Sequence, residues 1–355
     1  MIQNPSNQNP PKMTARKHGR AGWLTFTRPQ ALNALDGEMA AFVVRALQAW
    51  RDDPDVDLVL IDAEGARAFC AGGDIAAVWH AGRKGDFHTG GQFFRDEYRM
   101  NAMLAEYPKP VIAFMQGFIM GGGVGVGGHA RHRIVGESSC IAMPETGIGL
   151  VPDVGGTLIL ARAPGRIGEY LGTTGSRIGA ADAILAGFAD HYIPEADWPA
   201  LKARLAETGD PGVLPPGGEP PPGRLGAEQA LIARIFALPD IRAITDALAQ
   251  TPGDFAAETL TTLRRNSALS EEATLQLVRM TRANPTIREA LSNEFRFTLR
   301  AAEQGDFMEG VRAQLIDKDR TPQWGWTLAT LHAAKLREML APLPAEWRID
   351  FTDQA

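Results

Sequence analysis

Apolar segments that run into glycine clusters constrain the fold of this chain most strongly. The segments DLVLIDA (57–63) and KPVIAFMQG (109–117) each have the length and composition of a buried strand. The first leads into FCAGGD (69–74) and the second into MGGGVGVGGHA (120–130). Because helical patterns alternate with such strands along the chain, the sequence predicts an α/β fold with largely parallel strand pairing.

Two further strands and an amphipathic helix extend this pattern. The segments AGWLTFTR (21–28) and HRIVG (132–136) are each typical of a short strand. Asp36 is a plausible N-cap for a helix after the first of them. The apolar face of that helix is predicted to hold Met39, Phe42, Val43, Ala46 and Leu47.

The chain is predicted to divide into four parts. Residues 1–19 are rich in Asn, Gln and Pro and predict a disordered tail, within which Met13 is a candidate alternative start. Residues 20–207 are predicted to form the α/β core. In residues 208–224, Pro and Gly supply 11 of 17 positions, which predicts a flexible linker. Residues 225–355 are predicted to be a helical C-terminal region.

The periodicity of this last region is helical throughout. Its helical segments include AEQALIARIFA, DIRAITDALAQ, SEEATLQLVRM and TIREALSNEFRFTLRAAE. Asp240 and Ser270 are the first residues of two of these segments and are predicted to be N-caps.

Composition excludes several classes of protein. The 355 residues carry a formal net charge of -6, which argues against a nucleic-acid partner because nonspecific binding needs a basic surface. No run of about 18 apolar residues is present, so no membrane-spanning segment is expected. Cys70 and Cys140 cannot form a disulfide framework. The N-terminus lacks the apolar region of a secretory signal, and we expect a cytoplasmic protein.

The two glycine clusters can each place backbone N–H groups close to a ligand. At Gly72 and Gly73, no side chain blocks the approach of a ligand to the backbone. Gly121 to Gly123 fall where a strand is predicted to give way to a helix, and the first N–H groups of a helix lack intrahelical acceptors. Two such turns facing each other could direct two donors at one oxygen, as in an oxyanion hole, although either cluster alone is also explained by tight packing.

The segment MPETGIGLVPDVGG (143–156) places two acids, Glu145 and Asp153, among Gly, Pro and small apolar residues. The segment offers neither acid an obvious ion-pair partner. Burying a carboxylate without a partner is costly or raises its pKa. Both acids therefore either face solvent in an ordinary loop or line a pocket that uses them.

Other functional patterns are weaker. Gly123, Gly125 and Gly128 have the spacing of a dinucleotide-binding fingerprint, but they follow an earlier strand that has its own glycine turn. His129 and His132 have no further ligand pattern with them, so no metal site is predicted. Neither the nucleophile elbow of α/β-hydrolases nor a Walker motif occurs.

Four motifs, in this order, resemble those of the crotonase superfamily. They are TRPQALNALDGEM (27–39), ARAFCAGGDI (66–75), KPVIAFMQGFIMGGGVG (109–125) and AMPETGIGLVPDVGG (142–156). The resemblance covers roughly residues 20–200. It implies a crotonase-like spiral of ββα units that binds acyl-CoA thioesters, followed here by the helical C-terminal region.

Within the superfamily, the sequence most resembles the 3-hydroxyisobutyryl-CoA hydrolase subgroup. FFRDEY (93–98) and GDFMEGVRAQLIDKDRTPQW (305–324) are similar to motifs of that subgroup. Enoyl-CoA hydratases use two glutamates, and the first would fall at position 125, which is Gly125 here. The resemblance therefore implies hydrolysis of a short β-hydroxyacyl-CoA, with 3-hydroxyisobutyryl-CoA of valine catabolism as the expected substrate.

The resemblance also implies roles for particular residues. The N–H groups of Gly73 and Gly122 would hold the thioester carbonyl oxygen. Glu145 would either attack the carbonyl carbon or activate a water molecule. Asp153 would bind the substrate hydroxyl or the attacking water. Glu97 would hold that hydroxyl or orient the other acids.

Coenzyme A would be part of the substrate, and no metal or redox cofactor is expected. The CoA contacts would come mainly from the backbone, and Lys318 could meet a CoA phosphate. A homo-oligomer is a further possibility that the resemblance raises. The residues expected to contact CoA are Ala34, Leu35, Gly72, Asp74, Ile75 and Lys318.

Two other functions stay open at this point. An enoyl-CoA hydratase or isomerase would have the same fold, and Gly125 argues against it. A noncatalytic acyl-CoA-binding protein would not need both acids and both glycine turns. The acyl group itself is not fixed, because 3-hydroxypropionyl or another short β-hydroxyacyl group would carry the same thioester.

Overall fold

The computed structural model describes residues 11–351 and groups the chain into two compact units, each made of three segments. The first unit contains residues 1–73, 99–141 and 178–223. The second unit contains residues 74–98, 142–177 and 224–355. Two segments of the predicted α/β core, 74–98 and 142–177, thus pack with the C-terminal region.

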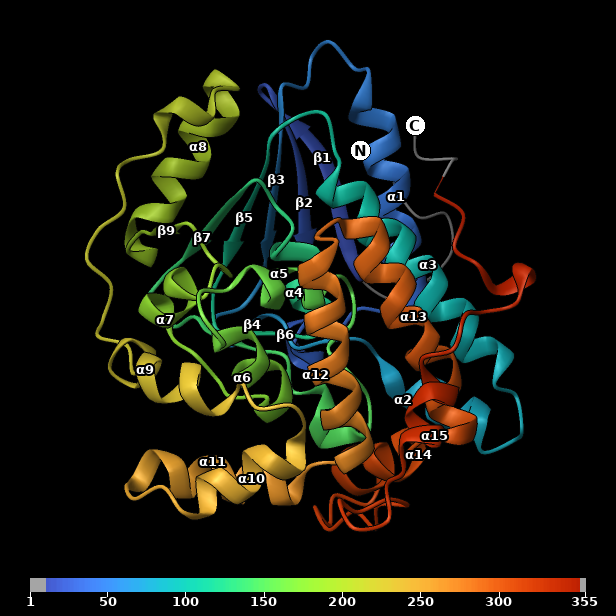
Figure 1. The fold of residues 1–355 in the computed structure, drawn as a ribbon. Coiled ribbons are helices and arrows are strands. Elements are labelled where there is room, and N and C mark those ends of the chain that lie inside the picture. The colour runs from blue at the N-terminus through green and yellow to red at the C-terminus, as the bar shows by residue number, and fades with distance from the viewer. Residues whose placement is uncertain (1–10, 352–355) are drawn as a thin grey trace. The chain divides into compact units, whose positions relative to one another are not determined.

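A six-stranded sheet forms the centre of the first unit (Figure 1). The strand order is β1-β2-β3-β5-β7-β9, with β1 antiparallel to β2 and the other neighbouring pairs parallel. This largely parallel pairing agrees with the sequence prediction. The strands are β1 Met13–His18, β2 Ala21–Phe26, β3 Leu58–Ala63, β5 Val111–Met115, β7 His132–Val135 and β9 His191–Tyr192.

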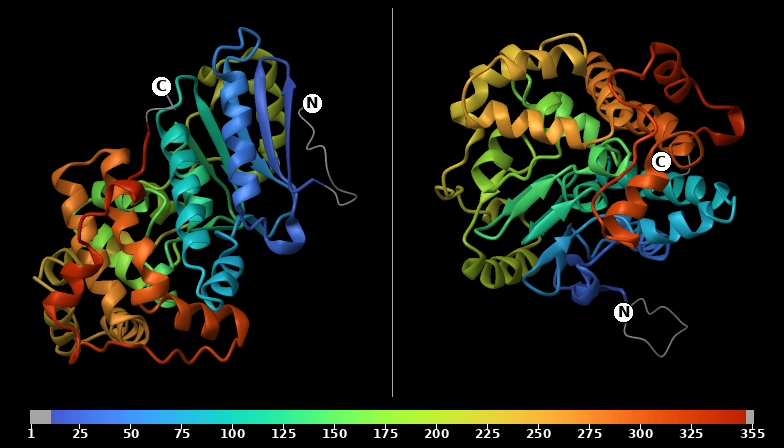
Figure 2. Two further views of the ribbon diagram at one scale, coloured as in Figure 1. Left: turned by 90° about the vertical axis from the view of Figure 1, so that its right-hand side faces the viewer. Right: turned by 90° about the horizontal axis from the view of Figure 1, so that it is seen from below.

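Helices cover both faces of this sheet. Ala21 packs in an apolar cluster with residues of α8 (Trp198–Thr208). The next residue, Gly22, points to the opposite face, where a β-carbon would overlap the ring of Trp50 in α1 (Gly37–Arg51). Successive strand residues face opposite sides, so this pair places α8 and α1 on opposite faces. Figure 2 shows α1 lying along the sheet.

The predicted start of α1 is confirmed. The carboxylate of Asp36 accepts a hydrogen bond from the Met39 N–H at 2.9 Å, as an N-cap does. The buried face of the helix contains every residue predicted for it. Its buried residues are Met39, Ala40, Phe42, Val43, Ala46, Leu47 and Trp50.

A second, three-stranded sheet gives the fold its repeat. Its order is β4-β6-β8, and each of these strands follows one strand of the large sheet in the chain. A helix comes after each strand pair, which is the ββα succession expected of a crotonase-like spiral. The small strands are β4 Ala68–Cys70, β6 Phe118–Met120 and β8 Cys140–Ala142, and the first unit also contains α4 Gly122–Gly127 and α7 Ala180–Leu185.

The predicted N-terminal tail needs a correction. Residues 1–10 lie outside the described part of the chain, but residues 13–18 form β1 and pair with β2 from Met13↔Phe26 to His18↔Ala21. Met13 and Ala15 are buried, on the same side of the strand. The prediction of disorder for residues 13–18 is wrong because pairing with β2 compensates for a polar local composition.

The second unit is mainly helical. Helix α12 packs against α5 and α6, α13 packs against α5 and α12, and α10 lies beside α11 (Figure 2). Helix α3 (His88–Ala105) belongs to both units. The other helices of this unit are α2 Ile75–Gly82, α5 Gly156–Arg162, α6 Ile167–Thr174, α9 Leu225–Ile235, α10 Ile241–Ala249, α11 Asp254–Arg265, α12 Ala268–Ala283, α13 Ile287–Gln304, α14 Phe307–Val311 and α15 Ala333–Met339.

Shorter turns complete the chain. The predicted linker contains one 3-10 turn, Pro211–Val213, and no longer element. The 3-10 turn η2, Glu145–Ile148, carries the first acid of the candidate site. The remaining short elements are the 3-10 turns Pro29–Ala31, Glu195–Asp197 and Ala345–Trp347 and the π-helical turn Arg312–Ile316.

Of the two N-caps predicted in the C-terminal region, one is confirmed and one is wrong. Asp240 accepts a hydrogen bond from the Ala243 N–H at 2.8 Å and caps α10. Ser270 lies inside α12, and its N–H donates instead to the hydroxyl oxygen of Ser267 at 3.2 Å. The helix starts one turn earlier because Ser267 precedes it in an extended conformation and supplies an acceptor for its first turn.

Candidate active site

The two glycine turns of the first unit lie at the same edge of the small sheet. Strands β4 and β6 are parallel neighbours, so the turns that follow them leave the sheet at the same end. Gly121, the residue before α4, has a φ of +47°, which favours glycine. A β-carbon at Gly123 would overlap the carbonyl oxygen of Cys70. The structure therefore brings the two predicted turns together, with the backbone at Gly73 and Gly122 on the same edge.

The predicted CoA-binding segment 32–35 is hydrogen-bonded to the first glycine turn. The Leu35 N–H donates to Gly72 O at 2.9 Å, and the Ala71 N–H donates to Leu32 O at 3.0 Å. Leu35 also forms a parallel bridge with Gly73. These contacts fix the backbone of Ala34 and Leu35 relative to the turn that carries the predicted oxyanion donor.

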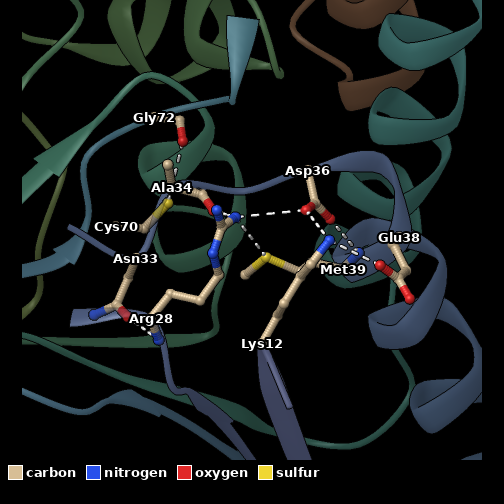
Figure 3. A network of polar contacts seen from close by, with 9 residues as sticks. All are labelled: Lys12, Arg28, Asn33, Ala34, Asp36, Glu38, Met39, Cys70 and Gly72. Atoms are coloured by element: carbon tan, nitrogen blue, oxygen red, sulfur yellow. Dashed lines mark hydrogen bonds and ion pairs between the residues drawn. The ribbon is translucent and has the colours of Figure 1, made fainter. Parts of the chain in front are cut away.

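Side chains that sequence reasoning missed hold this segment in place. Asn33 accepts a hydrogen bond from the Arg28 N–H at 2.8 Å and donates to the carbonyl oxygens of Glu64 and Ala68. The Arg28 guanidinium donates to Ala34 O at 3.1 Å (Figure 3). The sequence could have indicated both residues, because Arg28 and Asn33 lie in TRPQALN, directly before the residues Ala34 and Leu35 that are predicted to contact CoA.

A chain of charged contacts supports the same segment. The Arg28 guanidinium lies 3.4 Å from the carboxylate of Asp36, which also binds the Lys12 ammonium at 2.6 Å (Figure 3). Lys12 further pairs with Glu38 at 2.8 Å. Because these side chains are partly exposed, the pairs contribute modestly to stability. Their main consequence is to orient the loop between β2 and α1.

Three predicted acids meet in the second unit. Glu145 opens the turn η2, Asp153 precedes α5, and Glu97 lies on α3. Their exposed fractions are 5%, 4% and 2% respectively, so the alternative of solvated surface acids is wrong. The Tyr98 hydroxyl donates to Asp153 Oδ2 at 2.7 Å. Among the described residues, Glu97 Oε1 and Glu145 Oε2 have no hydrogen-bond partner.

Burial and mutual repulsion make these acids hard to ionise. Burial, followed by the nearby Asp153 carboxylate, raises the pKa of Glu145 and of Glu97 well above the ordinary value. Burial also raises the pKa of Asp153 to about 7, although its hydrogen bond from Tyr98 acts in the opposite direction. Carboxyl groups that exchange protons near neutral pH are suited to general acid–base work.

A fourth acid, Glu294 of α13, belongs to the same cluster and was missed by sequence reasoning. It is completely buried, and burial raises its pKa to about 8. Its carboxylate contributes to the raised pKa of Glu145. Tyr98 lies in the motif FFRDEY, so the sequence drew attention to its position. Nothing near Glu294 in the sequence marks it as part of a site, because an acid in a helical pattern is usually a surface residue.

The remaining predicted residues have different surroundings. Asp74 is the N-cap residue of α2, and Ile75 is its first residue. Lys318 is exposed and follows the π-helical turn. Lys318 has a φ of +58°, in the left-handed region. Residues 11–351 contain no helix that is both long and apolar enough to cross a lipid bilayer.

Comparison with known families decides what this arrangement belongs to. The family model described as enoyl-CoA hydratase/isomerase matches residues 21–340. The chain belongs to this family, the crotonase superfamily. Its fold confirms the predicted succession of ββα units with a helical C-terminal region. The match extends across both sides of the predicted linker.

Curated relatives of this crotonase are hydrolases by name. A mitochondrial 3-hydroxyisobutyryl-CoA hydrolase of Xenopus tropicalis is 38% identical over 320 residues, covering 87% of this chain and 83% of the relative. The 3-hydroxyisobutyryl-CoA hydrolase 1 of Arabidopsis thaliana is 36% identical over 319 residues, covering 85% and 83%. The predicted resemblance to this subgroup is confirmed.

Solved structures similar to this crotonase carry other names. An enoyl-CoA hydratase from Rhodobacter sphaeroides has a TM-score of 0.92 and 52% identity, covering 96% of this chain and all of that one. A carnitinyl-CoA dehydratase from Mycobacterium thermoresistibile has a TM-score of 0.91 and 35% identity, covering 96% and 99%. Similar proteins therefore carry names of two reaction classes, thioester hydrolysis and addition or loss of water.

Position 125 is where the resemblance to enoyl-CoA hydratases places their first glutamate. Gly125 is buried in α4, and its N–H donates to Gly121 O at 3.0 Å. Helix α4 is built from glycine and valine alone, so it offers no carboxylate. The first acid of the hydratase pair is thus absent from the position where the family pattern places it.

The acid cluster predicts a pH-dependent stability. The folded state raises the Asp153 pKa from an ordinary 3.8 to about 7, so it binds the proton more tightly than the unfolded state. The resulting stabilisation is complete below about pH 4 and is lost as the pH rises through about 7. Each pKa unit corresponds to about 1.4 kcal/mol, so we expect the free energy of unfolding to fall by a few kcal/mol.

Urea unfolding at a series of pH values measures this effect, with Asp153→Asn as the matched variant. The amide cannot ionise but keeps an acceptor for Tyr98, so its unfolding free energy should depend less on pH between 4 and 8. Equal pH dependence of the two proteins would show that Asp153 is ionised without cost in the folded state.

Proposed function

We propose that this crotonase hydrolyses the thioester of a short β-hydroxyacyl-CoA, with 3-hydroxyisobutyryl-CoA as the expected substrate. The observation that carries the proposal is the pair of buried acids Glu145 and Asp153 together with Gly125, which stands where the first glutamate of a hydratase is expected. Similarity to curated 3-hydroxyisobutyryl-CoA hydrolases over most of the chain supports it. Coenzyme A enters as part of the substrate, and the proposed reaction needs no separate cofactor.

The glycine turns supply the proposed oxyanion hole. Attack on a thioester moves negative charge onto the carbonyl oxygen. The N–H groups of Gly73 and Gly122 would bind that oxygen and stabilise the charge as it forms. Since both donors belong to backbone that packs at one sheet edge, they need little rearrangement during the reaction.

Glu145 is the proposed catalytic carboxylate. It either attacks the carbonyl carbon to form an anhydride, which water then opens, or takes a proton from the attacking water. In both routes the C–S bond breaks, water supplies the new C–O bond, and the CoA thiolate gains a proton. The raised pKa of Glu145 makes its carboxylate a stronger base, and makes its protonated form available to the leaving thiolate.

Asp153 and Glu97 are the proposed partners of Glu145. Asp153 would bind the substrate hydroxyl or the attacking water, with its carboxylate oriented by Tyr98. Glu97 would bind the hydroxyl or orient the other acids. Buried carboxyl groups can hydrogen-bond to a β-hydroxyl group. An acyl chain without that hydroxyl would leave them unpaired, so they would favour β-hydroxyacyl substrates.

A hydratase is the second candidate because a 52%-identical solved structure carries that name. Two assays on the purified protein separate the candidates. Release of free thiol from a panel of short acyl-CoA thioesters measures hydrolysis, and the absorbance of crotonyl-CoA measures hydration. We expect rapid thiol release from 3-hydroxyisobutyryl-CoA and 3-hydroxypropionyl-CoA, and negligible hydration. Robust hydration without thiol release would move the protein to the hydratases.

A cytoplasmic location and a homo-oligomeric state are further proposals from the sequence. Cell fractionation tests the first, and light scattering of the purified protein tests the second. Recovery with a membrane or organelle fraction, or a monomeric mass, would contradict them respectively.

A further inference from the structure

Helix α13 carries a buried acid, Glu294, that has no role in the proposed mechanism. Glu294 has an exposed fraction of 0%. Its carboxylate accepts hydrogen bonds from the backbone N–H groups of Gly155 at 2.8 Å and Thr157 at 3.0 Å, and from the Thr157 hydroxyl. All three donors lie just after Asp153, at the N-cap residue Gly155 and in the first turn of α5. A side chain distant in sequence therefore holds the backbone beside a proposed catalytic acid.

The backbone of this turn needs support from outside. Val154 has a φ of +54° and Gly155 a φ of +79°. The left-handed conformation is rare for a β-branched residue and persists only where surrounding contacts hold it. Gly155 is the N-cap residue of α5 and has no side chain to accept an N–H. The Glu294 carboxylate supplies the missing acceptor.

The same helix also supports the carboxylate of Asp153. Thr298 lies one turn after Glu294, and residues four apart share a helix face. The Thr298 hydroxyl is 3.2 Å from the hydroxyl of Tyr98, which donates to Asp153 Oδ2 at 2.7 Å. Helix α13 thus supports Asp153 in two ways. Glu294 holds the backbone that follows Asp153, and Thr298 contacts the Tyr98 hydroxyl that donates to the Asp153 carboxylate.

We propose that Glu294 is a positioning residue, which fixes the orientation of Asp153 for the reaction by accepting the N–H groups of Gly155 and Thr157. The proposal rests on the proposed function, because the role of Asp153 comes from there. Glu294 acts through the turn and not on the substrate. Loss of its contacts should therefore slow turnover more than it weakens acyl-CoA binding.

Glu294→Gln tests this directly. Glutamine presents one acceptor and one donor, so one of the two backbone N–H groups would face an NH₂ group. A misplaced catalytic group can cost about 100-fold in rate, and we expect kcat to fall by about 10- to 100-fold. KM for the best thioester of the panel should change by less than about threefold, since ground-state binding is kept. Glu303→Gln makes the same replacement of glutamate by glutamine at an exposed site on the same helix and should match the wild type.

Hydrogen–deuterium exchange tests the positioning without using activity. Peptides covering residues 154–158 should exchange faster in Glu294→Gln than in the wild type, with the rest of the protein unchanged. Wild-type exchange and wild-type kcat in this variant would overturn the proposal. A wild-type protein that releases no thiol would instead contradict the proposed function, and the exchange experiment would still test the contact.

Thr157→Val decides the matter if Glu294→Gln does not fold. It keeps the backbone N–H and removes the hydroxyl, which donates to Glu294 and also lies 3.2 Å from the hydroxyl of Thr281. A several-fold fall in kcat with an unchanged KM would support the proposal. Wild-type kcat in Thr157→Val, with Glu294→Gln unfolded, would assign Glu294 a role in stability alone and overturn it.

Discussion

We expect Glu145→Gln to abolish thioester hydrolysis and to leave the fold intact. The amide can neither attack the carbonyl carbon nor take a proton from water, and we expect kcat to fall by at least about 1,000-fold. The replacement has the same shape, and the buried Glu145 carboxyl already has a raised pKa. A neutral amide is therefore easily accommodated, and the thermal unfolding midpoint should equal or exceed that of the wild type at pH 8.

Free-thiol release and thermal unfolding, measured on the same preparations, check this prediction. Glu303→Gln on the surface of α13 controls for the replacement of glutamate by glutamine as such and should keep wild-type activity. Release of CoA by purified Glu145→Gln at a rate near that of the wild type would remove Glu145 from the mechanism. A large fall in the thermal unfolding midpoint of Glu145→Gln would mean that the Glu145 carboxyl group stabilises the fold.

We expect Asp153→Asn to cause the second large loss of activity. A positioned acid or base typically contributes about 10²–10⁴ in rate, and we expect kcat to fall by roughly 100- to 1,000-fold. The asparagine oxygen can still accept the hydrogen bond from Tyr98, so the turn should stay in place. The loss would then come from the missing acid itself.

Tyr98→Phe provides the graded comparison for this second prediction. It removes the hydroxyl that orients Asp153 but keeps the acid, so kcat should fall by about tenfold, less than in Asp153→Asn. Steady-state kinetics on the best substrate of the panel measures both variants. Equal losses in the two variants, or wild-type kcat in Asp153→Asn, would contradict the proposed role of Asp153.

Local chemistry made part of the fold predictable. Asp36 and Asp240 cap α1 and α10 as expected, because the signal of an N-cap lies within three residues of its partner. The N-cap prediction for Ser270 was wrong because Ser267, one turn earlier, also has a hydroxyl that can accept an N–H. Only the tertiary structure selects between the two serines. Strand β1 was missed because its stability comes from pairing with β2 rather than from its own composition.

The candidate site divides in a similar way. Glu145 and Asp153 stood out because a segment of small apolar residues gave them no local partner, and both are buried. Glu294 could not be found from the sequence, because what distinguishes it is contact with Gly155 and Thr157, far along the chain. Which side chains hold the acids of a cluster in place depends on which helices pack beside them. The periodicity of the sequence does not specify which helices pack together.

In the proposed mechanism, two backbone amides hold one thioester carbonyl while Glu145 acts on its carbon. A crystal structure of Glu145→Gln with 3-hydroxyisobutyryl-CoA bound tests it most directly. We predict that the carbonyl oxygen lies within hydrogen-bonding distance of the N–H groups of Gly73 and Gly122, with the residue 145 side chain next to the carbonyl carbon. A thioester bound with its carbonyl away from those amides, or with residue 145 out of reach, would contradict the claim.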